Sequence, residues 1–160
     1  MDVSGISNAV AVALHVLAAV VWVGGMFFAY LALRPALTEH SLLARAHLWV
    51  AVFRRFFPWV WASIVVLLAT GFFMIFNAFG GFRQTPLFVN VMLALGIAMM
   101  LLFVQVFFVP YRRLRHGVAV NDEPEARHAM HQIRVIILIN LVLGLIVIFV
   151  AASGAFALYD

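Results

Sequence analysis

Residues 15–35 read HVLAAVVWVGGMFFAYLALRP, a long apolar run with one ionisable side chain, His15, well inside it. On an α-helix, at about 100° per residue, one narrow face gathers an imidazole, an indole, a thioether and small side chains. These residues are His15, Ala18, Ala19, Trp22, Met26 and Ala29. Because an imidazole facing hydrocarbon is costly, the run predicts a membrane span whose His15 face points into a helical bundle.

The composition of the chain is typical of an integral membrane protein. It has 160 residues, of which 67% are hydrophobic and 10% charged, far more apolar surface than a soluble domain of this size needs. The chain has no cysteine, which excludes disulfides and thiolate metal sites, and all its basic residues are arginine, which excludes Schiff-base chemistry. The partner we expect is the lipid bilayer and not a nucleic acid, since the arginines lie at membrane boundaries.

Four apolar runs are each close to the roughly 20 residues needed to cross a bilayer. They lie at about residues 9–33, 59–79, 87–110 and 133–158. No alternating strand pattern is present, and an open sheet in lipid would leave backbone groups unpaired. The sequence therefore predicts an all-α fold over residues 1–160, a single bundle of four transmembrane helices. A bundle this small is expected to need a second copy, as a homodimer, or a partner membrane subunit to form an ion path.

The arginines predict the orientation of the bundle. All of them except Arg83 lie on or beside two of the three connections between spans. They are Arg34, Arg45, Arg54, Arg55, Arg112, Arg113, Arg115, Arg127 and Arg134. Because positively charged loops stay in the cytoplasm, we expect the connections between spans 1 and 2 and between spans 3 and 4 to be cytoplasmic. Both termini are then periplasmic, in a bacterial inner membrane.

The deepest candidate ligand is His15. Counting along the helices brings Met74 and Met92 to a similar level, and an imidazole with thioethers suits Cu(I). The same imidazole is able to act as an axial ligand of haem iron. A third reading is that His15 only donates a hydrogen bond to a neighbouring helix and holds the bundle together. The residues alone leave these three alternatives open.

A second group of polar side chains lies nearer the arginine-rich connections. His128 and His131 are three residues apart on one helix face, a spacing able to chelate one metal ion. Arg54 and Arg55 are topology signals first, and secondarily suit an anionic group such as a lipid phosphate or a porphyrin propionate. No carboxylate lies between Glu39 and Asp122, which argues against a proton-coupled transporter and a di-iron bundle.

Several short patterns carry a family resemblance. His15, Trp22 and Gly25, followed by Arg34-Pro35, resemble the first span of the copper-resistance protein D (CopD) family. The resemblance continues in RRFFP at 54–58, ATG at 69–71, PYRRL at 110–114 and NLVLG at 140–144, and covers nearly the whole chain. Larger CopD proteins are associated with moving copper across the inner membrane. The resemblance implies a small membrane protein that handles copper through an outer His/Met site, with the inner histidines as an exit.

The first span is also similar to that of HemJ, the oxygen-independent protoporphyrinogen oxidases, which are four-span proteins that bind haem. Their histidine, tryptophan and glycine match His15, Trp22 and Gly25, while a lysine of their third span is matched here by Asn90. This resemblance implies a b-type haem protein with a redox role and His15 as axial ligand. The other candidate cofactor-binding residues are then Trp22, Arg54, Arg55, Asn90 and Arg134. The cofactor is either a copper ion or haem b, and the sequence does not decide whether the protein is an enzyme. A purely structural or accessory membrane subunit also stays open.

Overall fold

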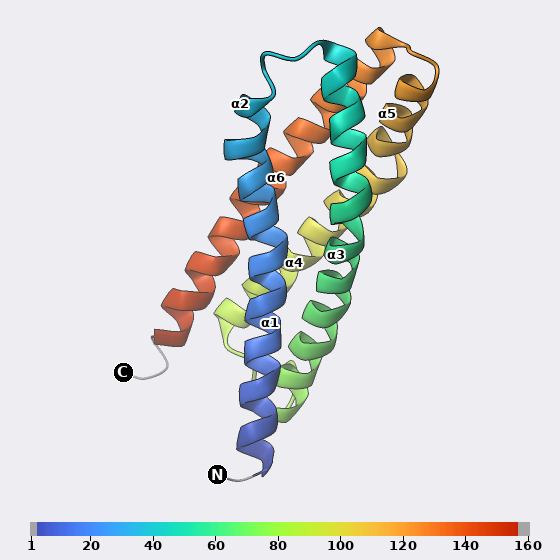
Figure 1. Cartoon of the computed structure of the whole chain (residues 1–160). Helices are drawn as coiled ribbons and strands as arrows, with labels where there is room; N and C mark the ends of the chain where they lie inside the picture. Colours follow the sequence, from blue (N-terminus) through green and yellow to red (C-terminus); the bar gives the residue numbers. More distant parts are fainter. Residues whose placement is uncertain (1–2, 157–160) are drawn as a thin grey trace.

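The computed structural model describes the backbone of residues 3–156 and the side chains of residues 5–154. Within this part of the chain every regular element is a helix (Figure 1). The elements are α1 (Val3–Phe28), the π-helical turn η1 (Ala29–Leu33), α2 (Arg34–Ala36), α3 (Leu42–Asn77), α4 (Leu87–Phe108), α5 (Pro110–Ala119) and α6 (Glu123–Phe156). The predicted all-α fold is confirmed.

Four helical stretches are long and apolar enough to cross a membrane: Gly5–Ala36, Leu42–Asn77, Leu87–Ala119 and Glu123–Gly154. These helices are longer than the four spans expected from the sequence, and most of the additional residues lie in the arginine-bearing segments next to the connections. Residues 157 and 158 of the expected fourth span lie outside the described residues. The chain is therefore a four-helix membrane protein whose helices are longer than the hydrocarbon layer requires.

The helices form two packed pairs that join along α6. α1 packs mainly on α3, α4 and α5 pack mainly on α6, and α6 also contacts α1 and α3. The first turn of α1 and the last turn of α6 lie at one end of the bundle, and the α2–α3 and α5–α6 connections lie at the other (Figure 1). We call the second end the arginine-rich end, because every arginine except Arg83 lies on the helix halves that reach it.

Helix α3 runs without interruption through Pro58. It begins at Leu42, where the Ser41 side chain accepts a hydrogen bond from the backbone N–H of Ala44 at 3.4 Å. Pro58 has no N–H and so removes one hydrogen bond, to the carbonyl of Arg54, without ending the helix. The polar segment before Pro58 and the apolar segment after it are thus one helix of 36 residues, about 54 Å long at 1.5 Å per residue.

An aromatic cluster fills the centre of the bundle. Trp49, Phe53 and Phe57 stack along α3 with ring centroids 5.1 and 5.0 Å apart. Phe57 meets Phe103 of α4 and Tyr111 of α5 edge-on. Edge-to-face and offset pairs of this kind are the arrangements that aromatic rings prefer. The cluster packs α3, α4 and α5 against one another in the half of the bundle nearer the arginine-rich end.

The inward face predicted for the first span is confirmed. Ala18, Trp22, Met26 and Ala29 are buried, and the Trp22 side chain is only 2% exposed. The other faces of α1 present large apolar side chains to the outside: Val12, Leu14, Val16, Leu17, Val20, Phe27 and Phe28. A helix with one small-residue face inward and aliphatic faces outward is what a bundle in lipid requires.

Candidate functional site

His15 of α1 meets Thr70 of α3, and this contact fixes the imidazole. The His15 Nδ1 and Thr70 Oγ1 atoms are 2.8 Å apart, and Thr70 Oγ1 lies 2.6 Å from the carbonyl oxygen of Val66 in its own helix. A hydroxyl has one proton, and the carbonyl of Val66 can only accept, so Thr70 donates to Val66 and accepts from His15. Assigning hydrogens by this network puts the proton on Nδ1 and leaves the Nε2 lone pair available.

The surroundings of His15 leave that lone pair unused. Within the described residues no hydrogen bond is formed by Nε2, and the side chain is half-buried. Gly71 lies beside the ring: a Cβ there would stand 3.5 Å from His15 Cε1. A ligand histidine characteristically donates its other N–H to a fixed acceptor, which sets its tautomer and orientation. Thr70 gives His15 this arrangement.

The two methionines predicted beside His15 lie on different helices. Met74 follows Thr70 by four residues, so it occupies the same face of α3, about 6 Å further toward the end that holds the termini. Met92 is in the first half of α4, and both methionine side chains are half-buried. The structure brings His15 and Thr70 into contact, while the grouping of His15 with Met74 and Met92 stays a prediction.

The other candidates from the sequence lie apart from His15. Trp22 is buried in the core, where its ring packs edge-on against the Phe103 ring with 6.2 Å between the ring centroids. Asn90 donates through Nδ2 to the carbonyl of Thr85 at 3.4 Å, so it braces the start of α4. Arg54 and Arg55 are exposed on α3.

The inner histidines form no closed metal site in the structure. His128 and His131 are exposed on α6 and border a shallow hollow together with Glu123, Pro124 and Arg127. Among the residues whose positions are described, no group of three or more His, Asp or Glu side chains is arranged to hold a metal ion. Metal chelation by His128 and His131 stays a prediction.

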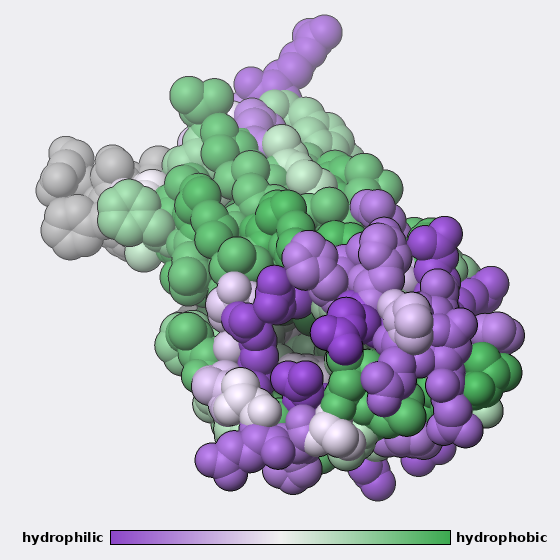
Figure 2. All heavy atoms as spheres, turned by 90° about the horizontal axis from the view of Figure 1, so that it is seen from above, coloured by the Kyte–Doolittle hydropathy of each residue, from purple (hydrophilic) through white to green (hydrophobic). Residues whose placement is uncertain are grey.

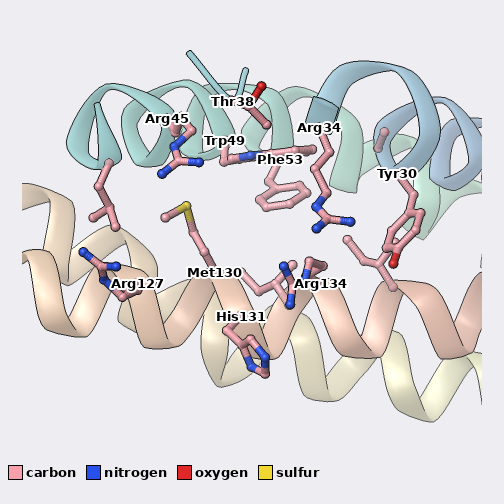
Figure 3. A pocket seen from close by; sticks show the side chains of 14 residues that line it. Tyr30, Arg34, Thr38, Arg45, Trp49, Phe53, Arg127, Met130, His131 and Arg134 are labelled. Carbon is pink, nitrogen blue, oxygen red and sulfur yellow. The ribbon is translucent and has the colours of Figure 1, made fainter. Parts of the chain in front are cut away.

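A cavity of about 280 Å³ opens at the arginine-rich end, between η1, α2, α3 and α6. Figure 2, which looks onto this end, shows a hollow ringed mostly by hydrophilic residues. Figure 3 shows arginines of α2 and α3 on one side and of α6 on the other reaching into the same space. The basic side chains lining it are Arg34, Arg45, Arg127, His131 and Arg134. Of these only His131 and Arg134 were singled out by the sequence as candidate ligands.

The haem alternative gains no support from this geometry. His15 lines neither the cavity nor the shallow hollow beside it, and Arg54 and Arg55 line neither as well. Of the candidate cofactor-binding residues, only Arg134 lines the cavity. Haem binding by His15 stays a prediction.

Sequence reasoning passed over two features. Thr70 was noticed only as part of the ATG pattern, because pairing it with His15 requires the relative heights of α1 and α3. Three of the cavity arginines, Arg34, Arg45 and Arg127, were assigned to topology alone. One signal was present for them: Arg127, His131 and Arg134 follow an i, i+4, i+7 spacing, which puts all three on one helix face.

Neither a curated protein nor a solved structure matches the chain. A family match is found for CopD, copper resistance protein D, over residues 50–153. The matched range covers well over half of the chain and includes Thr70, Met74 and Met92, while His15 precedes it. The chain thus belongs to the CopD family of copper resistance membrane proteins.

Proposed function

We propose that this protein binds Cu(I) inside the membrane and passes it on as part of copper handling. In this proposal the Nε2 atom of His15 is the nitrogen ligand, and the thioethers of Met74 and Met92 are the soft ligands. The observation that carries the proposal is the 2.8 Å contact between His15 Nδ1 and Thr70 Oγ1. With Nδ1 as the donor, this contact orients the imidazole and leaves Nε2 available to a metal. Membership of the CopD family supports copper as the substrate.

The chemistry of these side chains suits Cu(I) better than a harder cation. Cu(I) accepts thioether and imidazole ligands, whereas calcium, magnesium and manganese prefer carboxylate and carbonyl oxygens. No carboxylate occurs between Glu39 and Asp122, so a site at this depth has only neutral donors. A monovalent ion bound by neutral donors buries only one charge in the apolar interior, whereas a divalent ion would bury two.

The orientation of the site follows from the arginines. We infer that the arginine-rich end faces the cytoplasm of a bacterial cell, because arginine-bearing short connections stay on that side. The His15–Thr70 pair lies in the half of the bundle that holds the termini, so it is nearer the periplasmic face of the inner membrane. Copper would then enter the site from the periplasmic side, and His128 and His131 lie at the opposite, arginine-rich end.

Replacing Thr70 with valine is expected to weaken Cu(I) binding about 10–100-fold, the usual loss when the group that orients a metal ligand is removed. Valine keeps the branched shape but cannot accept the hydrogen bond from Nδ1, so both tautomers of His15 become populated. The measurement is a competition titration of the purified protein against a coloured Cu(I) chelator.

The matched control is Thr70→Ser, which keeps the hydroxyl and should restore wild-type affinity. This rescue separates positioning of the imidazole from packing, since serine lacks the methyl group and valine lacks only the hydroxyl. A folded Thr70→Val protein that binds Cu(I) as tightly as the wild type would remove Thr70 from the site.

A further inference from the structure

The cavity at the arginine-rich end concentrates positive charge without any counter-charge of its own. Four arginines line it, Arg34 from α2, Arg45 from α3 and Arg127 and Arg134 from α6, and no Asp or Glu is among the lining residues. Cations that share so small a space repel one another, more strongly where protein displaces water. An arrangement of this kind is favourable when an anion occupies the space between them.

Arg127 borders a shallow hollow together with Glu123, but no carboxylate of the described residues holds it or the other three arginines. Within residues 5–154 none of the four takes part in an ion pair, and the Nε atom of Arg45 is buried with no hydrogen-bond partner. The guanidinium of Arg34 lies over the Tyr30 ring, 5.2 Å from its centroid, which leaves the N–H groups at its edge free to donate. A buried donor without a partner is costly, and an anionic ligand would satisfy it.

Other features of the cavity point to phosphate as the anion. The planar guanidinium fork matches two oxygens of a phosphate, so several arginines around one space are suited to that group. The remaining wall is largely apolar and includes Trp49, Phe53, Ile133 and Ile137. The cavity opens at the end of the bundle (Figure 2), where headgroups lie if the apolar helices span the bilayer. Basic pockets between membrane helices at this level bind anionic headgroups.

We propose that this cavity binds a phosphate group, with guanidinium groups from α2, α3 and α6 around its oxygens (Figure 3). The proposal goes beyond copper binding and does not depend on it. The phosphate belongs either to an anionic phospholipid or to a soluble phosphate. The apolar wall and the membrane-boundary position favour the lipid. In both cases the bound group joins three helices and should raise the unfolding temperature of the protein.

The experiment uses the full chain, purified in a neutral detergent and freed of lipid. Retained lipid is counted by native mass spectrometry after addition of phosphatidylglycerol or phosphatidylcholine, and a separate arm follows thermal unfolding with inorganic phosphate. The test variant is Arg45→Gln with Arg134→Gln. The matched control is Arg54→Gln with Arg55→Gln, which removes two charges from the same end at exposed positions outside the cavity.

Phosphatidylglycerol should be retained in preference to phosphatidylcholine, and the Arg45/Arg134 variant should lose that retention about tenfold or more, since charge-assisted hydrogen bonds are removed. The Arg54/Arg55 variant should retain lipid like the wild type. If inorganic phosphate instead raises the unfolding temperature, with the same pattern among the variants, the source is soluble phosphate and the proposal stands.

The proposal is overturned if the wild type neither prefers phosphatidylglycerol nor responds to phosphate. It is also overturned if both double variants lose lipid equally, because that result indicates diffuse attraction to the arginine-rich end. Should the glutamine pair fail to fold, Arg45→Lys with Arg134→Lys keeps the charge but loses the bidentate fork. Its retention of phosphatidylglycerol should fall below that of the wild type, and unchanged retention would count against a guanidinium site.

Discussion

Replacing His15 with alanine is expected to reduce Cu(I) affinity by more than the roughly 10–100-fold predicted for loss of the orienting hydroxyl of Thr70. The variant removes the nitrogen ligand itself, and no other side chain at that depth offers an imidazole. The measurement is the same competition titration against a Cu(I) chelator, with unfolding followed in parallel. This change should have the largest effect on copper binding of any single substitution in the chain.

The control for this substitution is His47→Ala. His47 is exposed on α3 at the arginine-rich end, so its removal changes the number of imidazoles without touching the His15–Thr70 pair. A folded His15→Ala protein with wild-type affinity would place copper binding elsewhere and favour the structural reading. Under that reading the substitution costs only an interhelical hydrogen bond, which in membranes averages about 0.6 kcal/mol.

Replacing Gly144 with leucine is expected to lower the free energy of unfolding by about 1–3 kcal/mol, the usual cost of overpacking a filled core. A Cβ at this position in α6 would lie 2.8 Å from Val23 Cγ2 of α1 and 3.2 Å from Met99 Cε of α4. Val23 is buried and branched at Cβ, so it has little freedom to turn away. The larger side chain therefore forces three helices apart, and thermal unfolding in detergent measures the loss.

Gly24→Leu serves as the comparison for Gly144→Leu. A Cβ at Gly24 would meet nothing within 4 Å, and the residue is exposed on α1. The same change of residue type then adds a lipid-facing side chain and should leave the unfolding temperature near that of the wild type. Equal destabilisation by both substitutions would mean that α6 does not approach α1 closely at Gly144.

The fold was accessible from the sequence because lipid imposes simple constraints. Apolar runs of sufficient length can only be helices there, and the small-residue stripe of the first span indicated which face is inward. The burial of Ala18, Trp22 and Met26 confirms that argument. The continuity of α3 was harder to foresee, because its first half is polar and arginine-bearing and Pro58 favours a break. Phe53 and Phe57 before Pro58 pack on Tyr111 of α5, and Val60 after it is buried in the same core, so tertiary packing holds the helix together.

The contact between His15 and Thr70 was beyond what the sequence alone predicts. The two residues are 55 positions apart, and their meeting depends on how far α1 and α3 are shifted along each other. That shift follows from core packing and from the length of the connection, and a change of one helical turn would put a different residue beside His15. Counting residues from the expected span ends gave the correct half of the bundle but not the partner.

The arginine cavity depends on a local irregularity of the backbone. The N–H of Arg34 bonds to the carbonyl of Ala29, five residues earlier, because η1 is a π-helical turn. Such a turn changes the direction of the side chains that follow it relative to a regular α-helix. Helical periodicity therefore places Arg127, His131 and Arg134 on one face but does not predict that Arg34 lines the same cavity.

The central claim is that His15 is held as the Nδ1–H tautomer and offers Nε2 to Cu(I). The most direct measurement is nuclear magnetic resonance of the protein carrying ¹⁵N-labelled histidine and ¹³C-methyl-labelled methionine, before and after addition of Cu(I). The account predicts a protonated Nδ1 and an unprotonated Nε2 in His15, a shift of the Nε2 signal with Cu(I), and accompanying shifts of the Met74 and Met92 methyl groups. An Nε2–H tautomer, or His15 signals that do not change with Cu(I), would contradict it.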